Sequence, residues 1–122
     1  MSTRYPRGSE WRKWDLHVHT PASAIANTLG NNWDTFVEKL IDAAIYHDIR
    51  AIATADYFTI QGYRELQKYY NPDTRILSVN DKEIEIFILP GVELRLNAFT
   101  RRDESINLHV FFDPDKCSAE FI

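Results

Sequence analysis

The chain has 122 residues, enough for one domain with a single core. Its residues are 44% hydrophobic and 26% charged, which excludes wholesale disorder, and a formal net charge of −4 argues against a strongly basic nucleic-acid-binding module. Cys117 is the only cysteine, so the chain contains neither a disulfide framework nor a cysteine-rich zinc site.

The sequence carries no membrane or export signal. No apolar run approaches the roughly 20 residues of a membrane-spanning helix, and the polar start of the chain lacks the apolar core of a signal peptide. We therefore expect a soluble, cytoplasmic protein without membrane contact. Residues 1–12 are typical of a loose lead-in, and residues 13–122 are expected to form the folded part.

The first third of the chain predicts a strand, a loop and a helix. Residues 14–19 alternate apolar and polar side chains, as a half-buried strand does. Residues 20–32 are small and polar, which is typical of a loop. Apolar residues at helical spacing then predict a helix over about 33–47, with Asn32 as its N-cap.

The remainder is richer in strands. The apolar run 50–54 predicts a buried strand, and Thr59 could cap a second helix that ends at Asn71-Pro72. Further strands are expected at 76–79, 83–89, 92–97 and 106–112. The order of elements is an α/β pattern. A last helix beginning near Lys116 would be cut short, so we expect the front part of a larger protein.

Polar side chains lie on the faces of these strands that are opposite their apolar stripes. The set is His17, His19, Asp56, Glu93 and His109. Ligands bind at strand ends in α/β folds because side chains from several strands meet there. Imidazole and carboxylate together suit zinc, manganese or iron, so this set is a candidate metal site. The two imidazoles of a His-x-His strand, about 7 Å apart, suit one metal or two adjacent metals.

Each of these residues also has a purely structural interpretation. A His-x-His pair falls on exposed strands by chance, and a single glutamate such as Glu93 usually marks a solvated face. His109 could be a hydrogen-bonded core or surface histidine. Asp56 could cap the turn before the second helix.

The same residues fall into motifs whose order is familiar. The sequence DLHVHT at 15–20 resembles the opening motif of the PHP (polymerase and histidinol phosphatase) domain, and AIATADY at 51–57 resembles its second. The sequence LPGVE at 89–93 resembles the third motif of the family, and NLHV at 107–110 resembles its fourth. Order and spacing agree across about residues 11–113, so we identify the chain as resembling the N-terminal part of a PHP domain.

The resemblance implies an α/β fold, an incomplete distorted (β/α)7 barrel, and a metal-dependent phosphoesterase. It implies one to three divalent ions of zinc, manganese or iron. The implied ligands are His17, His19, Glu93 and His109, with Asp56 as a further ligand or catalytic base. Asp15 would orient a histidine, and Tyr57 would stand beside the ligands.

Three arginines are candidates for binding the substrate phosphate. Arg95 follows the third motif, and Arg101 and Arg102 lie in a charged turn. A solvated, charged turn is the more ordinary explanation of these arginines.

A narrower likeness concerns residues 7–21 and 56–63. They are similar to the PHP module at the start of large AAA-like or SMC-like ATPases, the TrlF-like proteins linked to DNA repair or phage defence. This likeness implies nucleic acid as substrate and an ATPase domain as partner, in the same full-length protein or in another chain. The chain has no Gly-x-x-x-x-Gly-Lys loop and is not itself the ATPase.

Departures from the family pattern keep other functions open. Tyr57 stands where the family has a ligating histidine, and residues 23–25 offer no ligand where a further one is usual. The final Asp-x-His motif is also missing. One alternative is therefore a degenerate, non-catalytic module that regulates or docks to an ATPase, and another is a small-molecule phosphatase. An incomplete barrel would leave a strand edge unpaired, so self-association is also expected.

Overall fold

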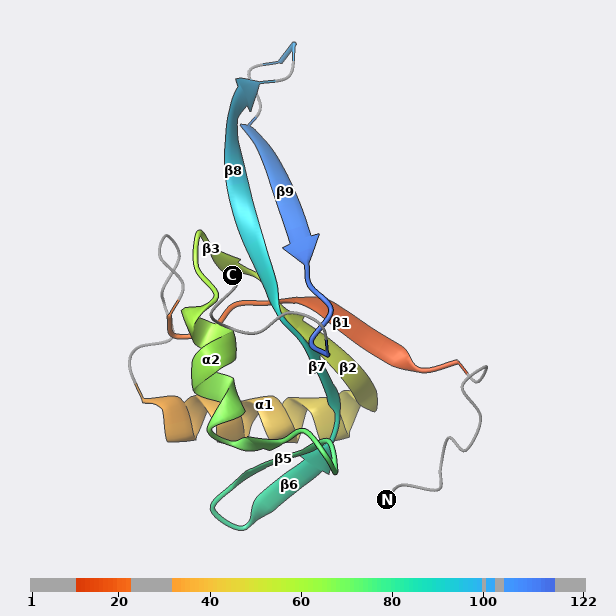
Figure 1. Ribbon diagram of the computed structural model, residues 1–122. Helices are drawn as coiled ribbons and strands as arrows, with labels where there is room; N and C mark the ends of the chain where they lie inside the picture. The colour runs from red at the N-terminus through yellow and green to blue at the C-terminus, as the bar shows by residue number, and fades with distance from the viewer. Residues whose placement is uncertain (1–10, 23–31, 100, 103–104, 116–122) are drawn as a thin grey trace.

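The computed structural model describes residues 11–22, 32–99, 101–102 and 105–115, which form two helices and nine strands (Figure 1). The strands group into three sheets of three strands each. In chain order the elements are β1 (Lys13–Val18), α1 (Trp33–His47), β2 (Ile49–Thr54), β3 (Asp56–Tyr57), α2 (Gln61–Gln67), β4 (Tyr70–Asn71), β5 (Ile76–Val79), β6 (Lys82–Glu85), β7 (Phe87–Leu89), β8 (Gly91–Phe99) and β9 (Ser105–Phe111). No helix in the described residues is long and apolar enough to cross a membrane.

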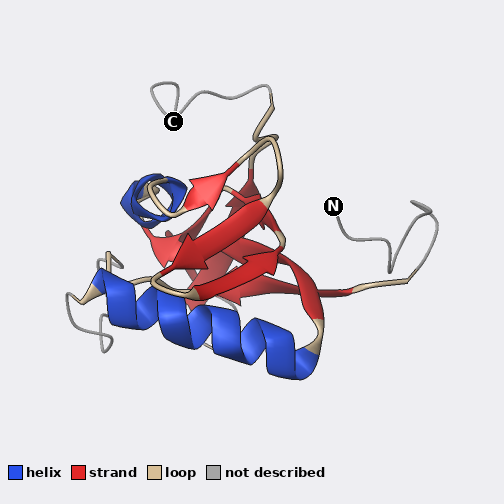
Figure 2. Ribbon diagram, turned by 90° about the horizontal axis from the view of Figure 1, so that it is seen from below, coloured by secondary structure: helices blue, strands red, loops and turns tan. Residues whose placement is uncertain are grey.

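The first sheet is parallel, in the order β1-β2-β7, and α1 lies between β1 and β2 in the chain. Figure 2 shows α1 lying along one side of the strands. The helix begins where the Asn32 side chain accepts a hydrogen bond from the Thr35 N–H at 3.1 Å. It ends at Asp48, whose φ of 56° is left-handed. The helix predicted at 33–47 and its Asn32 cap are confirmed.

The core lies between α1 and the strands that pack on it. Val37, Ile41 and Ala44 are the buried residues of the helix, and their spacing places them on one face. The buried residues that join them are Ile52, Leu66, Leu77, Val79, Ile84, Ile86 and Ile88. Burial of each large aliphatic side chain in this core stabilises the folded state by roughly 1.5–3 kcal/mol.

Two chain segments run directly from the first sheet into the second, whose order is β3-β8-β9. β2 continues through Ala55 into β3, and β7 continues through Pro90 into β8. The Thr54 hydroxyl lies between the two segments, 3.2 Å from the Gly91 amide nitrogen and 3.3 Å from its carbonyl oxygen. A Cβ at Gly91 would lie 2.3 Å from the Thr54 carbonyl oxygen, so this close approach requires glycine.

Antiparallel pairing dominates the rest of the fold. β8 and β9 form a long hairpin that projects from the body of the molecule (Figure 1). β4, β5 and β6 form the third sheet, which is antiparallel throughout. Lys82 in β6 contacts Asp42 of α1 at 2.7 Å, so this sheet is also tied to the helix.

The sequence predicted an incomplete distorted (β/α)7 barrel, and this prediction is wrong. The described residues form three small sheets, and no barrel closes. A (β/α) barrel needs consecutive parallel strands, each followed by a helix. Here α2 leads instead into the antiparallel β4-β5-β6 sheet, and β8 turns directly back into β9. The parallel α/β arrangement is limited to β1-β2-β7 and the short β3–β8 pair.

Two predicted element boundaries are also wrong. The second helix ends at Gln67, and Tyr70 already belongs to β4. The strand predicted at 83–89 is divided at Ile86 into β6 and β7, which lie in different sheets. The backbone of Ile86 is held by long-range partners, because its N–H donates to the Arg75 carbonyl and its carbonyl accepts from the Tyr70 hydroxyl. The lead-in up to residue 10 and the last predicted helix lie outside the described residues.

Candidate metal centre

Three histidines and one glutamate, from three strand segments, converge at one place. They are His17 in β1, His19 just after β1, Glu93 in β8 and His109 in β9. The Nε2 atoms of His17 and His19 lie 3.0 Å apart, and each lies 3.5 Å from Glu93 Oε2. The Nε2 atom of His109 lies 3.5 Å from Glu93 Oε1. These are four of the five metal ligands named from the sequence.

Strand pairing explains why these residues meet. Glu93 and His109 are directly opposite in the antiparallel β8–β9 ladder, so their side chains share one face. Tyr57 pairs with Glu93 in the parallel β3–β8 ladder. The Val18 carbonyl accepts a hydrogen bond from the Ala55 N–H at 2.9 Å, which holds the end of β1 beside the start of β3.

Glu93 is the buried centre of this cluster, with a side chain that is 3% exposed. Its Oε1 accepts a hydrogen bond from Asn107 Nδ2 at 3.0 Å. Its Oε2 is buried and has no hydrogen-bond partner, although it lies between His17 and His19. A buried carboxylate oxygen without a partner is costly, so its retention calls for a bound group or a proton between it and the imidazoles.

The distances fit a divalent ion. Zinc binds histidine nitrogen at roughly 2.0–2.1 Å and carboxylate oxygen at roughly 2.0–2.2 Å, so neighbouring ligand atoms on one ion lie about 3–3.5 Å apart. The separations of 3.0 and 3.5 Å among His17, His19 and Glu93 fall in this range. His17, Glu93 and His109 also each offer one ligand atom within 4.8 Å of the others. Without an ion, His17 and His19 can share one proton between their Nε2 atoms.

Asp56, the other acidic candidate, has different partners. It is fully buried, and its Oδ1 and Oδ2 accept hydrogen bonds from the Thr20 N–H and hydroxyl, both at 2.6 Å. Burial raises the pKa of this carboxyl, while the Thr20 hydrogen bonds and nearby His19 oppose the rise. A Cβ at Gly62 would lie 2.0 Å from Thr20 Oγ1 and 2.1 Å from Asp56 Oδ2. Asp56 is thus enclosed beside the cluster, with both oxygens already engaged.

The two supporting residues lie next to the histidines. Asp15 Oδ1 accepts a hydrogen bond from the His17 backbone N–H at 3.1 Å, so it contacts the main chain of His17. The Tyr57 ring stacks on His19, with centroids 5.2 Å apart and planes at 25°. Tyr57 therefore lines the cluster through the face of its ring.

The three arginines divide into one near the cluster and two far from it. Arg95 lies on β8 with its Cζ 5.5 Å from the centre of the Tyr57 ring. Arg101 and Arg102 are exposed at the far end of the β8–β9 hairpin. At the usual rise per residue this end is roughly 20 Å along β8 from Glu93, so the structure does not bring them to the cluster.

Sequence reasoning missed two residues that shape the site. Asn107 lies two residues before His109 and on the same strand face, so period-two alternation could have identified it. Thr20 closes the opening motif, but nothing local indicates that its partner is Asp56. The chain was also compared with protein-family models, curated proteins and solved structures, and none of them matches.

Proposed function

We propose that this chain is a metal-binding module that hydrolyses phosphoesters, as its likeness to the PHP motifs implies. The observation that carries the proposal is the buried Glu93 Oε2, which has no hydrogen-bond partner and lies 3.5 Å from each of two imidazole nitrogens. A carboxylate that only supported the fold would have its oxygens hydrogen-bonded. A carboxylate that binds a cation keeps one oxygen available for it.

The four converging side chains would hold the ion or ions. His17, His19 and the Oε2 side of Glu93 form one group of ligands, and His109 adds a nitrogen on the Oε1 side. A bound zinc, manganese or iron ion supplies hydroxide near neutral pH and neutralises charge on phosphoryl oxygens. Asn107 donates to Glu93 Oε1 and so would help to hold the carboxylate with its Oε2 beside the two histidines.

The three histidines form the exposed side of the cluster. The side chains of His17, His19 and His109 remain partly exposed, whereas Glu93 is enclosed behind them. A phosphoester can therefore approach the imidazole-lined face while the carboxylate stays shielded from water. The Arg95 guanidinium on the Tyr57 ring stands beside this approach and would attract the phosphate.

The narrower part of the proposal concerns setting and partners. We propose nucleic acid as the substrate and an ATPase domain, in the same full-length protein or another chain, as the partner in the cytoplasm. β1 and β9 are the outer strands of their sheets in the described part of the chain. Such edges can pair with a partner or with a second copy.

A second candidate function is a non-catalytic docking module, which Tyr57 favours. It stacks on His19 where the family pattern has a ligating histidine, so one ligand position is filled by a ring face. Such a module could retain one metal and lack turnover. Phosphodiesterase turnover would count against this candidate.

The test is metal content measured by plasma mass spectrometry on the chain and on its His17→Ala/His19→Ala variant. We expect at least one tightly bound transition-metal ion per chain, and its loss in the variant. His47→Ala is the matched control, because His47 is an exposed histidine at the end of α1.

Hydrolysis is then measured with p-nitrophenyl phosphate and with single-stranded DNA. A folded chain that binds no transition metal, or full hydrolytic activity in the double variant, would overturn the proposal. Metal binding without turnover would leave the docking module. Preference for p-nitrophenyl phosphate over DNA would favour the small-molecule phosphatase.

A further inference from the structure

Phe58, next to the candidate metal centre, has an unusual backbone conformation. Its φ is 58°, in the left-handed region that glycine and asparagine adopt readily and that bulky residues avoid. The residue is 51% exposed, so burial in the core does not compensate for this strain. Strain of this kind persists where the surroundings impose it, and it concentrates at binding sites.

Backbone pairing with β8 holds the chain in this conformation. Asp56 and Tyr57 pair with Val92 and Glu93 of β8. The Phe58 N–H donates to the Glu93 carbonyl at 3.1 Å, after which the chain turns toward α2. Phe58 is therefore attached through one backbone hydrogen bond to the residue at the centre of the cluster.

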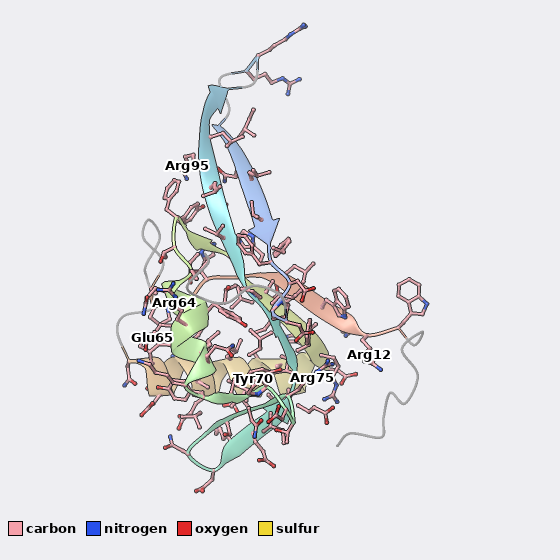
Figure 3. All side chains as sticks on the ribbon, viewed as in Figure 1. Arg12, Arg64, Glu65, Tyr70, Arg75 and Arg95 are labelled. Atoms are coloured by element: carbon pink, nitrogen blue, oxygen red, sulfur yellow. The ribbon has the colours of Figure 1, made fainter. Side chains whose placement is uncertain are left out.

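Two other side chains extend this exposed aromatic surface. The Tyr57 and Phe58 ring centroids are 6.4 Å apart, and the Arg95 Cζ lies 5.5 Å from the Tyr57 ring centre. Figure 3 shows Arg95 beside β8, on the side of β3. Arg95 is exposed and forms no ion pair within the described part of the chain, so its N–H groups are available to an anion.

We propose that Phe58, Tyr57 and Arg95 form a binding surface for one nucleotide unit, with the base on the Phe58 ring and the phosphate at Arg95. Aromatic rings stack on bases of any sequence, and guanidinium binds phosphate through paired hydrogen bonds. Tyr57 stacks on His19, so a nucleotide held on this surface would lie next to the histidine cluster. This inference rests on the proposed function and deepens it by naming the residues that would bind the nucleic acid.

The choice of a nucleotide over a sugar phosphate follows from the ring. A sugar phosphate could use Arg95, but it offers the Phe58 ring only a few C–H groups, whereas a flat base stacks over the whole ring. A residue with only a structural role at φ 58° would be improved by asparagine or glycine, because these relieve the strain. Keeping phenylalanine there sacrifices stability, which fits a ring retained for binding.

The experiment uses the full chain loaded with metal, and its probe is a fluorescein-labelled single-stranded oligothymidylate followed by fluorescence anisotropy. Thymidine 5′-phosphate and 2-deoxyribose 5-phosphate, which differ by the base, compete for the probe. The variants are Phe58→Asn, Phe58→Tyr and Arg95→Gln. Tyr46→Asn is the control, because Tyr46 is an exposed aromatic residue on α1.

We expect Phe58→Asn to weaken oligonucleotide binding about 10-fold while its thermal unfolding temperature stays equal or rises. Phe58→Tyr and Tyr46→Asn should bind like the parent, and Arg95→Gln should bind more weakly and with a shallower salt dependence. Thymidine 5′-phosphate should compete about 10-fold better than deoxyribose 5-phosphate in the parent, and this advantage should vanish in Phe58→Asn.

Unchanged binding in Phe58→Asn, equal competition by the two phosphates, or no oligonucleotide binding at all would overturn the inference. Its failure is separable from that of the proposed function. Metal binding and hydrolysis of p-nitrophenyl phosphate without a Phe58 effect would remove the inference alone. Phe58-dependent binding by a chain that holds no metal would remove the proposed function alone.

Discussion

Asp56 and Glu93 are two buried carboxylates on neighbouring paired strands, and they differ in how their oxygens are used. Both Asp56 oxygens accept hydrogen bonds from Thr20, and a glycine packs against them. One Glu93 oxygen accepts a hydrogen bond from Asn107. The other lies next to two imidazoles and has no hydrogen-bond partner. Both side chains are almost completely shielded from water.

The difference separates two roles that burial alone would not distinguish. A carboxylate whose oxygens are satisfied by its own chain ties elements together, here the segment after β1 to β3 and α2. A carboxylate with an oxygen left among imidazoles is arranged for a cation or a proton. We therefore expect changes at Asp56 to alter stability and changes at Glu93 to alter metal binding.

The largest expected effect is that of Glu93→Gln on metal binding. The amide keeps the shape of the side chain but removes the negative charge and the strong ligand atom, so metal affinity should fall at least about 100-fold. The apo protein should unfold at the same or a higher temperature, because a buried charge is removed. Metal titration and calorimetry measure the two effects. If this variant still bound one metal ion per chain, Glu93 would not be a metal ligand, and the two carboxylates would not differ in role.

The hydrogen-bonded Asp56 carboxylate is tested by the variant Gly62→Ala. The added Cβ would lie 2.0 Å from Thr20 Oγ1 and 2.1 Å from Asp56 Oδ2, so one of the two hydrogen-bonded groups must move. We expect the free energy of unfolding to fall by about 2–3 kcal/mol, measured by urea denaturation. Gln61→Ala, one residue away and exposed, is the control. An unchanged free energy of unfolding in Gly62→Ala would mean that the enclosure is loose.

The variant Asn107→Ala tests whether the hydrogen bond to Glu93 positions this carboxylate for metal binding. Removing the Nδ2 donor leaves Glu93 free to rotate, and metal affinity should fall about 10-fold, the lower end for residues that position a ligand. Isothermal titration with zinc measures this. Asn107→Gln should recover part of the affinity if the donor can still reach, whereas equal affinity in the parent and Asn107→Ala would remove the positioning role.

The smallest expected effect is the pH dependence that Asp56 imposes on stability. Burial raises the pKa of Asp56 in the folded chain above its unfolded value. The unfolded chain therefore releases this proton first, and stability is lost as the pH rises from about 4 through the raised pKa. Each tenfold change in proton affinity is worth about 1.4 kcal/mol.

The Asp56→Asn variant should lack this contribution to the pH dependence of the free energy of unfolding. Urea denaturation of both proteins over about pH 3–8 gives the difference in free energy of unfolding, which isolates Asp56 from other groups. The parent should lose stability relative to the variant as the pH rises, and the difference should level off above the folded pKa. A difference of the opposite sign would mean that the Thr20 hydrogen bonds outweigh burial.

Local patterns were sufficient for some elements and misleading for others. The helix at 33–47 and its Asn32 cap could be predicted, because an apolar stripe and a capping side chain act within one element. The end of the second helix could not, because Tyr70 pairs with Leu77 in β4–β5. The division at Ile86 likewise depends on partners at Arg75 and Tyr70.

The sequence by itself determined which polar residues share strand faces, and so it identified His17, His19, Asp56, Glu93 and His109 as one group. Only the tertiary structure decided that Asp56 is engaged by Thr20, that Phe58 stands exposed at a strained turn, and that the sheets do not close into a barrel. The reason is physical. Alternation along a strand follows from backbone geometry, whereas the pairing of distant strands depends on hydrogen bonds and packing between residues far apart in the chain.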